Sequence, residues 1–137
     1  KKLSEIVFQD KTKLECLNSV THPHIFNLMN NLVHKSHSKY IFFEVPLLFE
    51  AKLEKSFDFI ITISDKPESQ LIRLMKRDNL SKEEAINKIS SQLASPIKEE
   101  KADYVISNNS VLEDLKLQLS SLLEILPTIN SKTIKQF

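Results

Sequence analysis

The sequence contains no glycine, although glycine makes up about 7% of an average protein. Glycine supplies left-handed turns and lets the backbone approach phosphate groups closely. The 137 residues therefore hold neither a G-x-G-x-x-G dinucleotide fingerprint nor a G-x-x-x-x-G-K-[ST] phosphate loop. Either the protein does not bind phosphates through such loops, or the segment that does so is missing from these residues.

Cysteine is nearly absent, since Cys16 is the only one. A single cysteine excludes an internal disulfide and is typical of a reducing compartment, so we expect a cytoplasmic protein. We expect Cys16 to be a small buried hydrophobic residue and not a nucleophile. The net charge of +1 and the lack of a long apolar run argue against nucleic-acid and membrane partners. The four histidines have no Cys-x-x-Cys beside them, so we predict no metal site.

The densest apolar run, Tyr-Ile-Phe-Phe-Glu-Val-Pro-Leu-Leu-Phe-Glu, covers residues 40–50. Its length predicts a strand that is buried on both faces of a sheet. Pro46 has no backbone N–H, so we expect the hydrogen-bond ladder of the strand to end near it. Glu44 then comes just before the carboxyl end of the strand, where open α/β sheets bind ligands. The alternative is an ordinary core strand from which Glu44 reaches solvent.

Five helices are predicted from apolar spacing and capping residues. Asp10 can cap the first helix, and Thr-His-Pro at residues 21–23 should start a second one. A capping box of Ser81 and Glu84 opens a helix that Ser-Pro at residues 95–96 should end. The remaining helices are expected at residues 67–78 and 111–126.

Two further strands are predicted at residues 57–64 and 104–107, and the tail at residues 127–137 should be frayed. Strands that alternate with helices predict a single α/β domain with a parallel sheet. Three strands are few for such a sheet, which again suggests a missing segment.

Several polar side chains follow the predicted strands. Arg73 and Arg77 lie one helical turn apart on the helix after the second strand, and such a pair can hold a polyphosphate. The alternative is a solvated helix face paired with nearby carboxylates. Asn108 and Asn109 could read a base edge after the last strand, or could form a plain turn. Lys98 by itself indicates only a solvated surface.

Taken together, the order of these motifs resembles the dephospho-CoA kinases along nearly the whole chain. The residues that carry the resemblance are Val-Phe at 7–8, Leu-Asn at 17–18, Thr-His-Pro at 21–23, Glu-Val-Pro-Leu-Leu-Phe-Glu at 44–50, Pro-Glu at 67–68, Gln-Leu at 70–71, Arg-Leu at 73–74, Arg-Asp at 77–78, Leu-Ser at 80–81, Gln92, and Ala-Asp-Tyr-Val-Ile-x-Asn at 102–108.

This family consists of P-loop kinases that transfer the γ-phosphoryl group of ATP to the ribose 3′-hydroxyl of dephospho-CoA, with Mg²⁺, in the last step of coenzyme A synthesis. The resemblance implies an α/β fold with a three-layer parallel sheet of the P-loop nucleotide kinase type. The family's phosphate loop, its general-base Asp and the Mg²⁺ ligands would precede residue 1, so the fold would be incomplete. The strand that carries the phosphate loop would lie between those at residues 40–50 and 57–64.

The resemblance also assigns roles to residues of the ATP site. Arg73 would sit against the adenine of ATP, and Arg77 would face the phosphates as the one catalytic candidate of this chain. Lys98 matches a basic lid position that can approach phosphates, and Asn108 and Asn109 would lie in the adenine loop.

The acceptor, dephospho-CoA, would meet a different set of residues. By the resemblance, these are His22, Glu44, Pro46, Leu47 and Leu48. The implied subdivision is an acceptor-binding helical part at 1–39, core strands at 40–66, lid helices at 67–101, the last strand, adenine loop and C-terminal helix at 102–126, and a tail at 127–137.

The sequence departs from the family pattern at three positions. Glu44 replaces the usual Asp of the Asp-Val-Pro-Leu-Leu segment, which moves the carboxylate by one methylene. Asn79 and Ser110 replace glycines that often follow the lid Arg-Asp and the adenine-loop Asn. Asn tolerates a left-handed backbone, so we expect Asn79 to be a mild change.

We therefore expect these residues to be the C-terminal part of a dephospho-CoA kinase that is inactive alone. The alternatives are another P-loop nucleotide kinase, and a non-catalytic domain that binds a nucleotide or coenzyme A. The sequence does not determine the oligomeric state.

Overall fold

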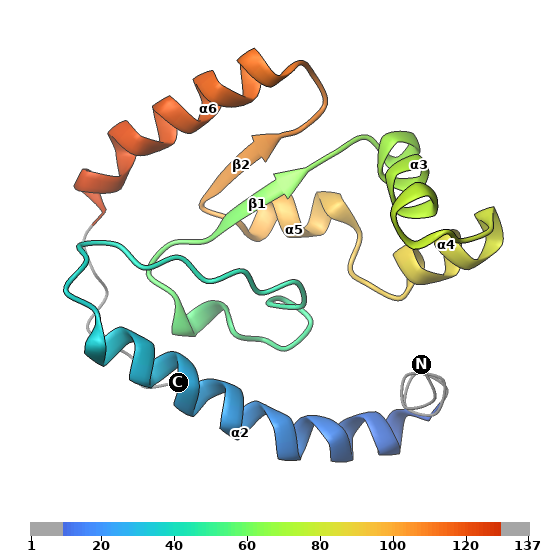
Figure 1. Cartoon of the computed structure of the whole chain (residues 1–137), viewed down its shortest axis with the longest axis horizontal. Coiled ribbons are helices and arrows are strands. Elements are labelled where there is room, and N and C mark those ends of the chain that lie inside the picture. The colour runs from blue at the N-terminus through green and yellow to red at the C-terminus, as the bar shows by residue number, and fades with distance from the viewer. Residues whose placement is uncertain (1–9, 130–137) are drawn as a thin grey trace. The chain divides into compact units, whose positions relative to one another are not determined.

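A computed structural model describes residues 10–129, which form two compact units that divide between Glu44 and Val45 (Figure 1). The first unit is mostly one helix. The second holds the sheet and the remaining helices. The predicted chain start at residues 1–9 and the tail from residue 130 onward lie outside the described residues.

Helix α2 (Lys11–Lys35) begins at Asp10, whose carboxylate accepts hydrogen bonds from the N–H groups of Thr12 and Lys13 at 3.0 and 3.2 Å. The prediction of a second helix start at residues 21–23 is wrong, because α2 runs through Pro23 without a break. The Thr21 hydroxyl donates backward to the carbonyl of Leu17 at 2.9 Å, so it does not act as a cap for the following residues.

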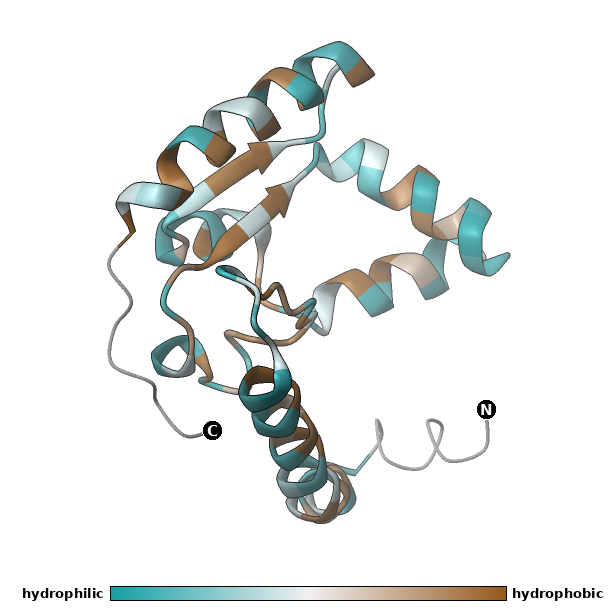
Figure 2. Cartoon of the chain, turned by 60° about the vertical axis from the view of Figure 1, so that its left-hand side comes forward, coloured by the Kyte–Doolittle hydropathy of each residue, from teal (hydrophilic) through white to brown (hydrophobic). Residues whose placement is uncertain are grey.

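The surface of α2 also corrects one expectation. Cys16 is exposed and has no disulfide partner, so it is not the buried residue that its side chain suggested. Hydrophobic and hydrophilic residues are interspersed along this helix (Figure 2). Several of its apolar side chains are exposed, including Val20, Ile25 and Leu28, whereas Met29 is buried.

The apolar run at residues 40–50 is not a strand, so that prediction is wrong. Residues 36–45 have no regular structure, and Phe42 is 65% exposed. Residues 46–52 form a turn instead. A buried strand needs a neighbour for its N–H and C=O groups, and in residues 10–129 the two strands bond each other. The turn bonds to itself, through Ala51 N–H to Leu47 O at 2.9 Å and Leu53 N–H to Leu48 O at 3.0 Å.

The sheet consists of β1 (Ile61–Ser64) and β2 (Tyr104–Ser107), which pair in parallel with Ile61 opposite Tyr104. Both predicted strands are confirmed, although β1 is shorter than the expected 57–64. A short 3₁₀ helix, η1 (Glu54–Ser56), precedes β1. The side chain of Ile63 on β1 is 69% exposed, whereas Ile106 on β2 is buried.

Helices α3 (Pro67–Asp78) and α4 (Lys82–Ser90) form a hairpin after β1 (Figure 1). Asn79 ends α3 with φ 52° and ψ 49°, which confirms that Asn serves there in a left-handed conformation. The capping box at α4 is confirmed: the Ser81 hydroxyl accepts from the N–H of Glu84, whose carboxylate accepts from the N–H of Ser81 at 2.8 Å.

Helix α4 ends earlier than predicted, and residues 95–96 start a helix where they were expected to end one. That helix, α5 (Ser95–Lys101), has a proline in its first turn, where the missing N–H would have no helical partner in any case. It packs along β1: the Thr62 hydroxyl donates to the carbonyl of Lys98 at 3.4 Å, and the Ser64 hydroxyl donates to the Glu99 carboxylate.

Helix α6 (Leu112–Ile125) confirms the helix predicted at residues 111–126; it lies beside β2 and continues into a 3₁₀ turn, η2 (Leu126–Thr128). Pro127 lies in that turn, so the chain stays coiled past the expected end. The buried apolar residues of the second unit are Phe49, Ile60, Ala85, Ile106, Leu122 and Leu126.

Candidate functional site

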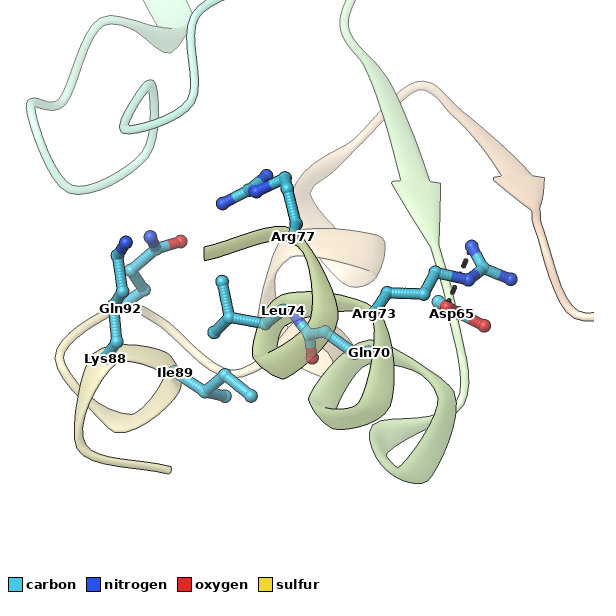
Figure 3. Close-up of a pocket in the computed structure, with 8 residues that line it drawn as sticks. All are labelled: Asp65, Gln70, Arg73, Leu74, Arg77, Lys88, Ile89 and Gln92. Carbon is cyan, nitrogen blue, oxygen red and sulfur yellow. Dashed lines mark ion pairs between the residues drawn. The ribbon is translucent and has the colours of Figure 1, made fainter. Parts of the chain in front are cut away.

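A groove of about 450 Å³ lies between α3 and α4 (Figure 3). Leu74 and Ile89 give it an apolar floor, and charged or amide side chains form the rest of its wall. The lining residues are Asp65, Gln70, Arg73, Leu74, Arg77, Lys88, Ile89 and Gln92. The sequence placed Arg73 and Arg77 on one face of their helix, and the structure brings both to this groove.

A smaller cavity of about 230 Å³ continues the groove toward the sheet. The two cavities share Gln70, Ile89 and Gln92. The smaller one is lined further by Thr62 and Ile63 of β1, by residues 93–95 and by Lys98. These two adjoining cavities are called the channel below, and their linings include the cationic side chains Arg73, Arg77, Lys88 and Lys98.

Arg73 joins the ends of both strands to α3. Its guanidinium lies 3.1 Å from the carboxylate of Asp65, which follows β1, and donates to the carbonyl of Asn108, which follows β2, at 3.2 Å. The ion pair is visible in Figure 3. Planar guanidinium groups suit two such acceptors at once. Arg73 is therefore fixed at the carboxyl edge of the sheet, where parallel sheets bind ligands.

The loop after β2 is held to the loop after β1 by two further bonds. The N–H of Asn108 donates to the carbonyl of Ser64 at 2.7 Å, and the side-chain oxygen of Asn109 accepts from the N–H of Lys66 at 2.7 Å. Because Arg73 also binds the carbonyl of Asn108, the loop that carries both asparagines is bonded to α3 as well. The structure thus brings together three of the predicted ATP-site residues.

Arg77 and Lys88 share one carboxylate at the other end of the groove. Two nitrogens of Arg77 lie 2.8 and 3.2 Å from the two oxygens of Asp78, and Lys88 Nζ lies 2.6 Å from Asp78 Oδ2. The hydrogen bond from Arg77, the one from Lys88 and their charges hold the pKa of Asp78 well below its usual range. The Arg77 side chain remains 72% exposed, so it is accessible to a ligand in the groove.

Lys98 is the most enclosed cation of the channel, with 17% of its side chain exposed. Its Nζ lies 3.0 Å from the carboxylate of Glu50 and donates to the side-chain oxygen of Gln92 at 3.2 Å. The same Glu50 oxygen accepts from the N–H of Leu93 at 2.9 Å. Burial opposes ionisation of Glu50, but the bonds from Leu93 and Lys98 and the charge of Lys98 outweigh it and lower the pKa of Glu50.

Each cation predicted for the ATP site therefore has a carboxylate partner to which the sequence analysis assigned no role. Asp65 pairs with Arg73, Asp78 with Arg77, and Glu50 with Lys98. The available signal for Asp78 was its place beside Arg77. Glu50 gave no signal by spacing, because Lys98 is distant in sequence, and Asp65 gave none, because it precedes the helix that carries Arg73.

The predicted acceptor residues fall into both units. His22 belongs to α2, where its ring packs on that of Phe26 with centroids 5.8 Å apart, and Glu44 is exposed at the end of the same unit. In the second unit Pro46 and Leu47 are exposed and Leu48 is half-buried. That these five residues contact dephospho-CoA stays a prediction.

Within residues 10–129, no group of three His, Cys, Asp or Glu side chains converges as a metal site requires. In the same part of the chain, no helix combines the length and the apolar character that a membrane span needs.

Comparison with known proteins gives a consistent family. The family model described as dephospho-CoA kinase matches residues 1–114. A dephospho-CoA kinase from Listeria innocua is 46% identical over 126 residues, which are 90% of this chain and 63% of that protein. One from Fusobacterium nucleatum is 47% identical over 115 residues, or 84% of this chain and 60% of that protein.

Solved structures agree with this result. The crystal structure of TT1252 from Thermus thermophilus matches with a TM-score of 0.83 and 30% identity, over 91% of this chain and 65% of that one. A dephospho-CoA kinase from Campylobacter jejuni matches with a TM-score of 0.59 and 32% identity, over 92% and 64%. The chain spans less than two thirds of the length of these relatives. The model of an α/β unit with a small parallel sheet fits an incomplete P-loop kinase fold, and the chain belongs to the dephospho-CoA kinase family.

Proposed function

We propose that this chain forms three parts of an ATP-dependent dephospho-CoA kinase of the cytoplasm. These are the nucleotide lid (α3, α4 and α5), the adenine loop after β2, and part of the surface that binds the acceptor, called the acceptor wall (Pro46, Leu47 and Leu48). The observation that carries the proposal is the channel between α3, α4 and α5, whose lining includes Arg73, Arg77 and Lys98. This arrangement suits a ligand that carries several phosphates, and ATP is the phosphoryl donor of the family.

In the proposed reaction, the 3′-oxygen of the dephospho-CoA ribose forms a bond to the γ-phosphorus of ATP. The bond between that phosphorus and the oxygen that bridges to the β-phosphate breaks, and ADP leaves with the electron pair. The proton of the 3′-hydroxyl passes to a base that we place outside residues 10–129, together with the phosphate loop and the Mg²⁺ ligands. Mg²⁺ would neutralise phosphate charge when it is bound.

The described residues would supply positioning and charge. Arg73, fixed by Asp65 and the Asn108 carbonyl, offers a planar face on which an adenine ring can stack. Arg77 is exposed and can leave Asp78 for a phosphate, because a phosphate offers a doubly charged partner in place of a single carboxylate. Lys98 would meet phosphates from the α5 side of the channel.

The test uses the complete gene product that contains these residues, purified and incubated with Mg²⁺, ATP labelled in the γ-phosphate, and one acceptor at a time. We expect label in dephospho-CoA and none in nucleoside monophosphates. Transfer to a nucleoside monophosphate alone would assign a different nucleotide kinase, and binding of ATP without any transfer would indicate a non-catalytic domain.

The site is tested separately by Arg77→Ala, with Lys76→Ala as a matched control on the same helix and outside the lining of the groove. Removing one preorganised cation from a developing charge costs roughly 100-fold in turnover, so we expect a loss of that order for Arg77→Ala. Lys76→Ala should stay close to the unsubstituted protein. Equal activities of the two variants would remove Arg77 from the proposed site.

A further inference from the structure

The turn formed by residues 46–52 is bonded to α5 and to the connector at residues 91–94, which leads from α4 into α5. Glu50 makes both links: its carboxylate accepts from the N–H of Leu93 in the connector and pairs with Lys98 on α5. Two more contacts reinforce the link to α5, since Lys101 pairs with Glu54 at 3.4 Å and lies over the Phe49 ring at 5.9 Å.

The connector is the place where the α3–α4 hairpin rejoins the rest of its unit. On its N-terminal side, the hairpin carries Arg73 and Arg77. On its C-terminal side, α5 is bonded to β1 through the carbonyl of Lys98 and the carboxylate of Glu99. A bond to Leu93 therefore acts on the hinge between the lid helices and the sheet, where small displacements shift the whole hairpin.

The carboxylate of Glu50 is largely enclosed. Its side chain is only 21% exposed, and its second oxygen, Oε2, is buried without a hydrogen-bond partner among the described residues. The bonds from Leu93 and Lys98 and the charge of Lys98 nevertheless favour the ionised form in the folded protein. The charge is therefore held in one geometry by partners that lie in the connector and on α5.

We propose that Glu50 is a positioning residue that couples the acceptor wall to the ATP lid. The inference rests on the proposed function, because Pro46, Leu47 and Leu48 of the same turn are the expected acceptor contacts and the hairpin holds the expected ATP contacts. Glu50 touches neither reacting group. It fixes the turn, the connector and Lys98 in one arrangement, so that the two substrates, each held by its own residues, stay aligned.

Two substitutions at Glu50 separate the two bonds. Glu50→Gln keeps an oxygen for the Leu93 N–H but loses the charge that pairs with Lys98, and Glu50→Ala loses both. The matched control is Glu54→Gln, which breaks another ion pair between the same stretch and α5 without any bond to the connector. A role limited to attaching residues 46–54 to α5 predicts similar effects for Glu50→Gln and Glu54→Gln.

The experiment measures steady-state kinetics of the complete protein with ATP and dephospho-CoA, well below the melting temperature of each variant. Misalignment of bound reactants lowers the chemical rate more than binding, so Glu50→Ala should reduce kcat by roughly 10-fold or more. The KM values for both substrates should stay within about threefold. Glu50→Gln should fall between Glu50→Ala and the unsubstituted protein, and Glu54→Gln should behave like the unsubstituted protein.

Hydrogen exchange of the ligand-free proteins gives a second readout that needs no turnover. Glu50→Ala should speed exchange in the connector and in α4, whereas Glu54→Gln should not. The proposal is overturned if the two variants match in exchange, or if Glu50→Ala raises KM while kcat is unchanged. If the unsubstituted protein does not phosphorylate dephospho-CoA, the proposed function fails, and the exchange comparison still decides whether Glu50 holds the hinge.

Discussion

The side-chain amide of Gln118 on α6 bonds to both backbone groups of Ser107, the last residue of β2, in the way that the backbone of a neighbouring strand would. Its side-chain oxygen accepts from the N–H of Ser107 at 2.7 Å, and its side-chain nitrogen donates to the carbonyl of Ser107 at 2.9 Å. The next residue, Asn108, donates to Ser64 on β1 instead. Successive residues of a strand point their backbone groups to opposite sides, so the Ser107 groups face away from β1 and depend on Gln118.

Gln118→Met removes both bonds with little change in side-chain size. Each intramolecular hydrogen bond contributes a net of about 0.5–1.5 kcal/mol, so the loss should be about 2 kcal/mol of unfolding free energy. For a protein of about 150–250 residues this corresponds to a decrease in Tm of roughly 4–8 °C. Thermal and urea unfolding of the complete protein measure it, with Lys116→Met, at an exposed site on the same helix, as the control.

Gln118→Glu tests the same geometry through pH. One carboxylate oxygen can still accept from Ser107 N–H, but the other faces the Ser107 carbonyl and repels it. The repulsion disfavours the ionised form, so the pKa of the new side chain should be raised in the folded protein. The variant should therefore regain stability as the pH falls through that raised pKa, because the protonated acid can donate to the carbonyl.

The result for Gln118→Met decides whether this geometry is right. An unfolding free energy of Gln118→Met within about 0.5 kcal/mol of the unsubstituted protein would refute the reasoning.

Three further predictions concern other parts of the second unit. Ser81→Ala removes the capping box of α4 and should cost about 1 kcal/mol, with faster hydrogen exchange confined to the first turn of that helix. Leu122→Ala, at a side chain that is 4% exposed, should cost about 2–5 kcal/mol in urea unfolding, whereas Leu123→Ala at a 63% exposed neighbour should cost far less; similar losses would contradict the packing of α6. The pKa of Glu50 is lowered in the fold, so the charged side chain should make the unsubstituted protein more stable than Glu50→Gln at any pH above the usual glutamate pKa. This difference in unfolding free energy should disappear as the pH falls through the lowered pKa. A difference that does not change with pH would mean that the charge is not involved.

Local signals in the sequence predicted the parts of the fold that local interactions determine. The capping box of Ser81 and Glu84, the left-handed Asn79 and the start of α3 at Pro67 each depend on a few neighbouring residues. The β-branched run of β1 and the short β2 were also recognised, because their composition suits a buried strand.

The failures occurred where distant residues decide. The run at residues 40–50 has the composition of a strand, but a strand requires a partner, and the described residues provide none for it. Pro23 and Pro96 were read as boundaries, yet α2 continues through Pro23, and α5 begins at Ser95 with Pro96 in its first turn. Proline lacks a backbone N–H and restricts its own φ angle, but it does not by itself decide which helix it joins.

In the candidate site, too, the features set by local spacing could be predicted, and those set by contacts between distant residues could not. The shared face of Arg73 and Arg77 follows from helical spacing, and both line the groove. The bond from Leu93 to Glu50 joins residues that are 43 positions apart, and Lys98 lies even farther along the chain from its partner Glu50, so periodicity cannot reveal either contact. Gln118 could have been noticed as a polar residue on the face of α6 that carries Leu115 and Leu122, although its partner Ser107 could not.

The most direct test of the account compares the complete gene product with the 137-residue chain in one assay, which follows phosphate on the ribose 3′-hydroxyl of dephospho-CoA in the presence of ATP and Mg²⁺. We predict that the complete protein forms the 3′-phosphorylated product and that the 137 residues alone do not, because they hold no glycine-rich phosphate loop. Robust turnover by the 137 residues alone, or no product from the complete protein, would contradict it.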